Sequence, residues 1–423
     1  MSIEVLSTVF LAFALVHSFL TPVFAKLSKK FPADSIGESF FHLLAEVEVV
    51  FGFWAGIFLT VWAIIEGPSK VIDYQQSLNM TEPLFVFCIM ILASTRPIVT
   101  IARTFLLSIV HVLSRIVPVD EKIIQIFVLL SFGPMLGSLI TEPAAITILA
   151  LLLYRMLDKA DEKLLYGVLA LLFVNISIGG GLTHFAAPPI LIVAQKFGWG
   201  LKDVFVNLGE AVICAVFVNA LLFCLVFKKK ISEQISKLEA EHYPMPWWVI
   251  ILHVLLMVFV VMSSHYQNVF MSLFMAFIGL TTVTKKYQDG LKFKEAFLVG
   301  FFLAGLIIFG SMQKWWLTPI LQVITDKALF FAATGLTAVT DNAALTYLGS
   351  QVESLSNSSK WALVSGAITG GGLTILANAP NPAGFSILAS RFPNSSLNAV
   401  KLLLAAIVPT AIACLFFMLL GNF

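Results

Sequence analysis

Apolar stretches of roughly 17 to 25 residues, each long enough to cross a bilayer as a helix, follow one another along most of the chain. A backbone that faces lipid must satisfy its hydrogen bonds internally, which restricts what these stretches can form. Hydrophobic residues make up 59% of the 423 residues and charged residues 12%, and the mean hydropathy is +0.95. That leaves too little polar surface for a soluble domain. The expected fold class is therefore an all-α polytopic membrane protein.

About ten transmembrane spans are expected, and three of them are interrupted. They cover residues 2–25, 38–65, 83–113, 164–197, 204–227, 247–262, 268–284, 294–312, 361–390 and 398–421. The interruptions fall at Pro97 in the third span and at glycines in 164–197 and 361–390, which read as broken helices. Two further apolar segments, 121–157 and 315–353, contain a polar kink and fit re-entrant hairpins. The first span has no basic residue ahead of it, which favours a retained span over a cleaved signal peptide.

The distribution of basic residues predicts an orientation. If both hairpins return to the side they came from, each half makes five crossings and the halves have opposite orientations. Most of the 26 Lys and Arg residues then lie on the inner side, with the N-terminus and C-terminus outside. On this scheme residues 1–227 form a first inverted repeat, 228–246 a cytoplasmic linker and 247–423 a second inverted repeat.

An internal duplication supports this division. TEPAAITIL at 141–149 matches TDNAALTYL at 340–348, and each is followed by GGGLT, at 179–183 and at 370–374. Two motifs duplicated in the same order, within halves of opposite predicted topology, are typical of an inverted-repeat secondary transporter. The alternative is that the glycines only let apolar helices pack closely.

These motifs, together with FHLLAEVEVVFGFW at 41–54 and STRPIV at 94–99, resemble the sodium/proton antiporters of the ion transporter superfamily, relatives of the arsenite and divalent-anion/sodium transporters. The resemblance implies two inverted repeats whose hairpin tips meet unwound helices near the bilayer midplane, and a homodimer. The tips would be Thr141-Glu142-Pro143 and Thr340-Asp341-Asn342, and the unwound segments 179–189 and 370–382. Carboxylate-transporting relatives carry a neutral Ser-Asn-Thr type of tip, so the acids here argue against an anionic substrate.

The residue types at these breaks suit a hard cation. Glycine permits unusual backbone angles, and backbone carbonyls freed from a helix can coordinate a cation together with hydroxyl and amide oxygens. Carboxylates inside a membrane usually mark an ion or proton pathway, where proton and cation compete. The alternative is that each acid only caps the helix that follows it. The candidate ion-binding and proton-binding residues are Glu142, Asp341, Thr141, Thr340, Asn342, Gly180, Thr183, Gly371, Thr374, Asn378 and Asn381.

Four other polar residues within the spans allow two interpretations each. His42 and Glu46 are four residues apart and share a helix face, so they can form a proton relay or pair with Arg96. Arg96 can instead be a structural counter-charge between helices. His184, inside the first break, can line the pathway or bond a backbone carbonyl.

No pattern indicates an enzyme. GGGLT lacks the Lys and Ser or Thr of a phosphate loop, and no catalytic triad or metal-ligand spacing is present. The formal net charge of +2 gives no sign of a nucleic-acid partner, and no cofactor is expected. The expected partners are small inorganic ions and the lipid bilayer. We expect a cation/proton antiporter of the cell inner membrane that exchanges Na⁺ for H⁺ by alternating access. The alternatives are a sodium-coupled symporter of a small anion or organic acid, and a passive channel.

Overall fold

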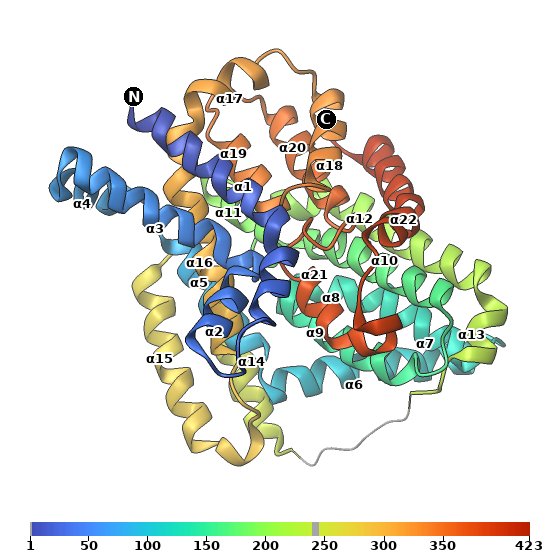
Figure 1. Ribbon diagram of the computed structural model, residues 1–423. Coiled ribbons are helices and arrows are strands. Elements are labelled where there is room, and N and C mark those ends of the chain that lie inside the picture. Colours follow the sequence, from blue (N-terminus) through green and yellow to red (C-terminus); the bar gives the residue numbers. More distant parts are fainter. Residues whose placement is uncertain (1, 239–244) are drawn as a thin grey trace.

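The computed structural model describes residues 2–238 and 245–423, so the expected linker 228–246 lies partly outside the described residues. All regular secondary structure in these two ranges is helical, which confirms the all-α fold class (Figure 1). Among the described residues, eight helical stretches are long and apolar enough to cross a membrane, and one of them, Glu121–Ile140, includes both α7 (Glu121–Leu130) and α8 (Phe132–Ile140). A ninth span results if α4 (Pro68–Ser77) and α5 (Thr81–Ala93), which meet at 63°, are counted as one.

The helices of the first half precede the gap in the described residues, and those of the second half follow it. The first half also contains α1 (Ile3–Ser28), α2 (Ile36–Leu44), α3 (Val47–Glu66), α6 (Arg96–Ile116), α7 (Glu121–Leu130), α8 (Phe132–Ile140), α9 (Glu142–Met156), α10 (Glu162–Gly179), η1 (Gly180–Leu182), α11 (Pro188–Phe197), α12 (Leu201–Val226) and α13 (Lys228–Gln234). The second half contains α14 (Trp247–Met262), α15 (Gln267–Val283), α16 (Phe293–Gly310), α17 (Lys314–Leu321), α18 (Asp326–Thr337), α19 (Asn342–Ser350), α20 (Asn357–Gly370), α21 (Asn381–Leu388) and α22 (Ala399–Leu420).

Two of the expected spans are each divided into separate helices. Segment 38–65 breaks between α2 and α3, where Glu46 is extended and its carboxylate reaches Lys294. Segment 83–113 breaks between α5 and α6 at Ser94 and Thr95. Pro97 lies in the first turn of α6, where its missing N–H costs nothing, and a proline at that place disfavours continuation of the preceding helix.

The segment expected as the first hairpin contains three helices, because α7 and α8 are separate. Pro134 has no N–H for the carbonyl of Leu130, and that carbonyl instead accepts a hydrogen bond from Asn175 Nδ2 at 2.7 Å. The segment expected as the second hairpin likewise contains α17 ahead of α18 and α19. Each hairpin tip is therefore formed by the last two helices of its segment.

The interruptions expected at the glycines are present. In the first half α10 ends at Gly179 and α11 begins at Pro188, and in the second half α20 ends at Gly370 and α21 begins at Asn381. The two broken helices contact each other, and each hairpin contacts the broken helix of the opposite half: α9 packs on α21, and α11 packs on α19. The halves are thus packed crosswise around the breaks.

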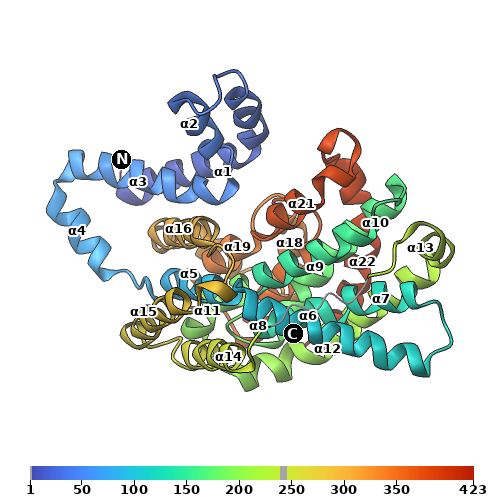
Figure 2. The same ribbon diagram turned by 90° about the horizontal axis from the view of Figure 1, so that it is seen from below.

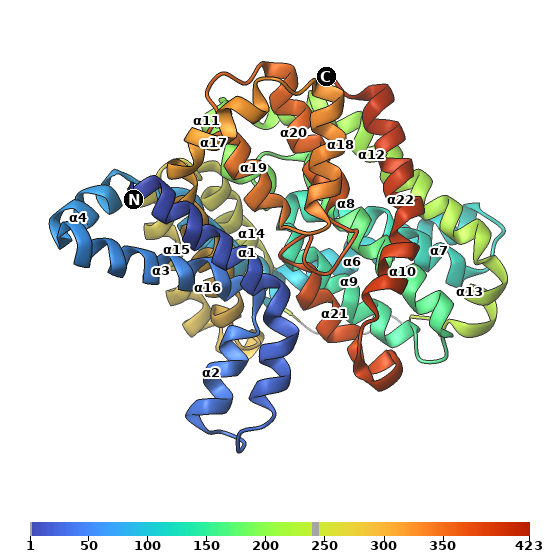
Figure 3. The same ribbon diagram turned by 45° about the horizontal axis from the view of Figure 1, so that its top comes forward.

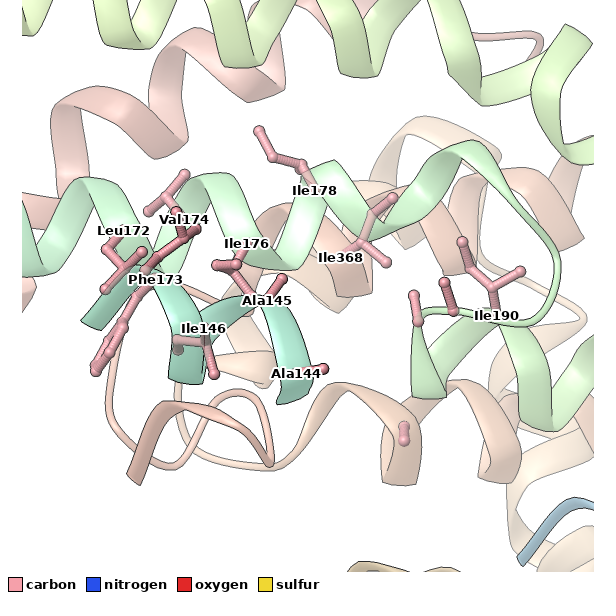
Figure 4. Close-up of a cluster of buried hydrophobic side chains, with 14 of the residues drawn as sticks. Ala144, Ala145, Ile146, Leu172, Phe173, Val174, Ile176, Ile178, Ile190 and Ile368 are labelled. Carbon is pink, nitrogen blue, oxygen red and sulfur yellow. The ribbon is translucent and has the colours of Figure 1, made fainter. Parts of the chain in front are cut away.

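The remaining helices surround this centre. Figures 2 and 3 show α1, α2 and α3 to one side of the molecule, and α16 connects them to the rest by packing on both α3 and α5. Almost every residue of α10 is buried. Apolar side chains of α9, α10, α11 and α20 meet at the centre, among them Ile146, Phe173, Ile190 and Ile368 (Figure 4). This packing holds the tip of the first hairpin against both broken helices.

Candidate ion-binding site

The first hairpin tip is fastened to the first break by hydrogen bonds from both sides. The N–H of Glu142, at the start of α9, donates to the carbonyl of Ala186 at 3.3 Å. Thr183 Oγ1 donates to the carbonyl of Ser138 at 2.8 Å, and Ser138 Oγ donates to the carbonyl of Gly179 at 2.7 Å. These bonds leave the backbone at the break paired within the protein.

The second tip makes matching contacts with the second break. The N–H of Asn342, at the start of α19, donates to the carbonyl of Ala377 at 3.0 Å, and Thr374 Oγ1 donates to the carbonyl of Ala338 at 2.8 Å. Asn381 Nδ2 closes this break by donating to the carbonyls of Gly371 (2.8 Å) and Thr374 (3.0 Å).

These contacts show that the two acids of the repeated motif do not occupy corresponding positions in the two halves. The matched sequences align Glu142 with Asp341, whereas in the structure Glu142 and Asn342 occupy corresponding positions. Each is the first residue of its helix. Each lies four residues after the residue whose carbonyl accepts a hydrogen bond from the threonine of the break. Each also donates its N–H to the carbonyl of the alanine that lies three residues after that threonine. The reason is that α19 begins one residue later in the motif than α9 does.

Glu142 is fully buried and is bonded across the two halves. Asn378 Nδ2, from the second break, donates to Glu142 Oε2 at 2.9 Å, while Glu142 Oε1 accepts no hydrogen bond from the described residues. The N-terminus of α9 adds the positive end of a helix dipole. A carboxylate in this position is stable when it also binds a proton or a cation, because a buried charge without a partner is costly.

Glycines allow the tips to approach the breaks. A Cβ atom at Gly180 would lie 2.4 Å from Glu142 Oε1, and a Cβ atom at Gly371 would lie 2.0 Å from Ser177 Oγ and 2.9 Å from Asn342 Nδ2. Both positions are the middle glycine of their triplet. A side chain at either one would fill the space into which the tip residue extends.

Five buried side-chain oxygens in this region accept no hydrogen bond from the described residues. They are Thr141 Oγ1, Glu142 Oε1, Asn342 Oδ1, Asn378 Oδ1 and Asn381 Oδ1. Buried polar atoms normally have hydrogen-bond partners, so several buried acceptors without a protein partner suit the binding of a donor or a cation. Carboxylate, amide and hydroxyl oxygens are the ligands that hard cations take. The arrangement can therefore hold a small cation or a proton.

Asp341 makes different contacts in the same region. It is the N-cap of α19, and its Oδ1 accepts hydrogen bonds from the N–H groups of Ala343 (2.8 Å) and Ala344 (3.2 Å). This is the capping alternative that its position in the motif allowed. Asp341 also lines a small cavity with Asn378, Phe302 and Pro382, so its carboxyl group remains close to the partner of Glu142.

Thr141, the single residue between α8 and α9, has φ 78° and ψ 149°. A β-branched residue rarely adopts positive φ, and this part of the map is almost restricted to glycine, at a cost of ~1–3 kcal/mol. Its side chain caps no helix N–H. The strained turn instead brings Glu142 against Gly180.

Several predicted site residues lie apart from these oxygens. Thr340 Oγ1 donates to the carbonyl of Leu336 within the turn after α18. Glu46 pairs with Lys294 (2.8 Å) and His42 (3.6 Å), whereas Arg96 pairs with Asp289 (2.9 Å), so Arg96 and Glu46 have different partners.

His184 lies in the first break, where its ring lies beside those of Phe185 and His265. Its ring centroid lies 5.9 Å from that of His265, in the turn between α14 and α15, and its Nδ1 bonds none of the described residues.

Two serines of the site were not singled out from the sequence. Ser138 of α8 donates to the carbonyl of Gly179 (2.7 Å) and accepts from the N–H of Leu182 (3.0 Å), both at the first break. Ser177 of α10 donates to the carbonyl of Ile368 (2.7 Å) and accepts from Asn342 Nδ2 (3.3 Å). A lone serine in an apolar helix ordinarily bonds its own backbone. The one sequence signal for Ser177 is its position two residues before the glycine triplet.

Broken helices that meet hairpin tips around buried oxygens, within a bundle of membrane-length helices, define a polytopic membrane transport protein. Comparison with known families gives a more specific assignment. Residues 2–420 match the family described as "Putative Na+/H+ antiporter", and the chain belongs to this family.

A curated relative extends the comparison. Part of the chain is similar to the protein named Na(+)/H(+) antiporter NhaB of Yersinia pestis bv. Antiqua (strain Angola), with 25% identity over 201 residues. The match covers 40% of this chain and 38% of that relative, so the chain aligns with well under half of the relative's length.

Proposed function

We propose that the protein exchanges a monovalent cation, Na⁺ in the first instance, for H⁺, and that the two compete for Glu142. The observation that carries the proposal is the fully buried Glu142 carboxylate, which has one oxygen bonded by Asn378 and one without a hydrogen bond from the described residues. The free oxygen can take either a proton or a cation coordinated together with the neighbouring amide and hydroxyl oxygens. Membership of the antiporter family and the partial similarity to NhaB support the same exchange.

The two halves suit transport by alternating access. We propose that they are inverted repeats, and that the hairpins and broken helices move as a unit against the surrounding spans while the cation or proton is enclosed. The crosswise packing of α9 on α21 and of α11 on α19 supports such a unit. A charged, empty Glu142 site would cross the membrane only reluctantly, so the carrier moves when it is loaded, and exchange results.

The test is proton flux in proteoliposomes that contain a pH-sensitive dye. A pulse of NaCl should cause saturable alkalinisation or acidification with wild-type protein, and Glu142→Gln should abolish it. Glu162→Gln is the matched control, because Glu162 lies at the start of α10 in an exposed pair with Lys401 and should leave the flux unchanged.

Two results would overturn the proposal. The first is a Na⁺-dependent proton flux that persists in Glu142→Gln. The second is a flux that requires an added dicarboxylate, which would favour a sodium-coupled symporter.

A further inference from the structure

The number of carboxyl groups at the centre of the site differs from the number of acids in the repeated motif. The motif carries an acid in each half, Glu142 and Asp341, and therefore suggests two equivalent carboxylates. The contacts pair Glu142 with Asn342 instead. The position in the second half that corresponds to Glu142 thus carries a neutral amide.

Asn342 extends toward the same centre as Glu142. Its Nδ2 lies 2.9 Å from the place a Cβ atom would take at Gly371, just as Glu142 Oε1 lies 2.4 Å from the Cβ position at Gly180. Its Nδ2 donates to Ser177 Oγ, and its Oδ1 is among the buried oxygens that accept no hydrogen bond from the described residues. An amide oxygen can coordinate a cation, but it takes up no proton in exchange.

Asp341 is occupied as a helix cap. Two N–H groups donate to its carboxylate, and the N-terminus of α19 adds a favourable dipole. These interactions hold the carboxylate of Asp341 at the start of α19, whereas Oε1 of Glu142 accepts no hydrogen bond from the described residues.

His184 is the other titratable group at the breaks. Its ring faces that of His265, with 5.9 Å between the two ring centroids. The contacts of Glu142 are with Asn378, Gly180 and Ala186 and do not include His184. Glu142 is therefore the one carboxyl group in the described site that is both buried at the centre and incompletely bonded.

We infer that the carrier exchanges one monovalent cation for one proton and moves no net charge, an inference that rests on the proposed function. When Glu142 is the single exchangeable carboxylate, one bound cation and one bound proton each neutralise its negative charge. The loaded carrier then has the same charge in either direction. Asn342 determines this stoichiometry, because an acid at that position would allow a second proton to exchange.

The decisive measurement is the dependence of the final Na⁺ gradient on membrane potential. Proteoliposomes receive a fixed pH gradient, and valinomycin with K⁺ sets the potential either to zero or to about 100 mV. One net charge per cycle would change the final Na⁺ ratio about 50-fold at 100 mV, because that potential is worth ~2.3 kcal/mol per charge. For the wild type we expect the same ratio at both potentials. A change of that size would overturn the inference while leaving the proposed exchange intact.

A pair of variants at position 342 tests the assignment to Asn342. Asn342→Asp should make the final Na⁺ ratio depend on potential, whereas Asn342→Ala, which adds no acid, should leave it independent of potential even if exchange is slower. An Asn342→Asp protein that exchanges without any dependence on potential would contradict the assignment. If Asn342→Asp does not fold as a monodisperse protein, the wild-type measurement still decides. Wild-type protein with no Na⁺-dependent proton flux would refute the proposed function itself.

Discussion

The two hairpin tips resemble each other in sequence, but they differ in how the chain turns and in where the acid is directed. A single strained residue, Thr141, joins α8 to α9 and brings Glu142 into the site, whereas four residues, 338–341, join α18 to α19 and leave Asp341 as the cap. The first tip therefore has no side-chain cap and presents a carboxylate, while the second has a cap and presents an amide. A one-residue shift in the start of a helix is enough to give the same motif two different sets of contacts.

The largest expected effect concerns the glycine triplets that receive the tips. A Cβ atom at Gly372 would lie 2.3 Å from the Cα atom of Val174, and backbone cannot move aside as a side-chain end can. Gly372→Ala should destabilise the protein by ~3 kcal/mol, the upper range for overpacking. At Gly181 the nearest atoms are side-chain ends of Ile368 and Val212 at 3.3 Å, so Gly181→Ala should be nearly neutral. Thermal unfolding in detergent, followed by loss of monodisperse protein, compares the two. Equal unfolding midpoints for the two variants would show that the two triplets leave the same amount of space for a side chain.

The next effect distinguishes the two acids. Glu142→Asp withdraws the carboxylate from Asn378 Nδ2, so we expect the Na⁺ concentration for half-maximal exchange to rise about tenfold, equivalent to ~1.4 kcal/mol. Asp341→Asn retains a side-chain acceptor for the N–H groups of α19, since Asn is also a good N-cap, and should change this concentration little. Na⁺ titrations of the proton flux measure both values. A larger shift for Asp341→Asn would indicate that the second acid, too, binds the transported ion.

Helix capping provides a smaller contrast. Asp341→Ala removes the acceptor for the N–H groups of Ala343 and Ala344 and should cost ~1 kcal/mol of stability. Thr141→Ala removes no such bond, because Thr141 makes no side-chain cap. The midpoint of thermal unfolding should therefore fall for Asp341→Ala and stay close to that of the wild type for Thr141→Ala. The reverse order would mean that the first tip is the capped one.

The smallest effect concerns backbone strain. Thr141→Gly places a residue that tolerates φ 78° at the first tip, and relief of strain should outweigh the extra backbone entropy lost on folding, giving a gain of up to ~1 kcal/mol. Thr141→Ala keeps the strain and also lacks Oγ1, so it serves as the control. Unfolding midpoints should rank Thr141→Gly above Thr141→Ala. If Thr141→Gly is the less stable of the two, the turn is not strained.

Much of the architecture could be predicted from the sequence because hydrophobic length and backbone chemistry determine it. The apolar stretches identify the helical class, and the glycines and prolines around 179–189 and 370–382 locate the breaks. The interruption of 83–113 was expected from Pro97, but the division of 38–65 into two helices was not predicted, because it depends on local contacts such as the ion pair between Glu46 and Lys294.

The roles of the acids could not be predicted, for a geometric reason. Successive residues on a helix point about 100° apart, so moving the start of α19 by one residue makes Asp341 the N-cap and gives Asn342 the position that Glu142 has in the first half. The sequence match has no means of detecting this shift. Ser177 was missed for a related reason, since its importance arises from the crossing of α10 and α20.

The bond between Asn378 and Glu142 joins residues 236 positions apart in the chain, and this affects how the protein is made. While the ribosome is still synthesising the C-terminal half, the newly inserted N-terminal half contains a buried acid whose amide donor does not yet exist. The first half therefore stays incompletely assembled, with its acid hydrated or protonated, until α21 has been synthesised and packs on α9.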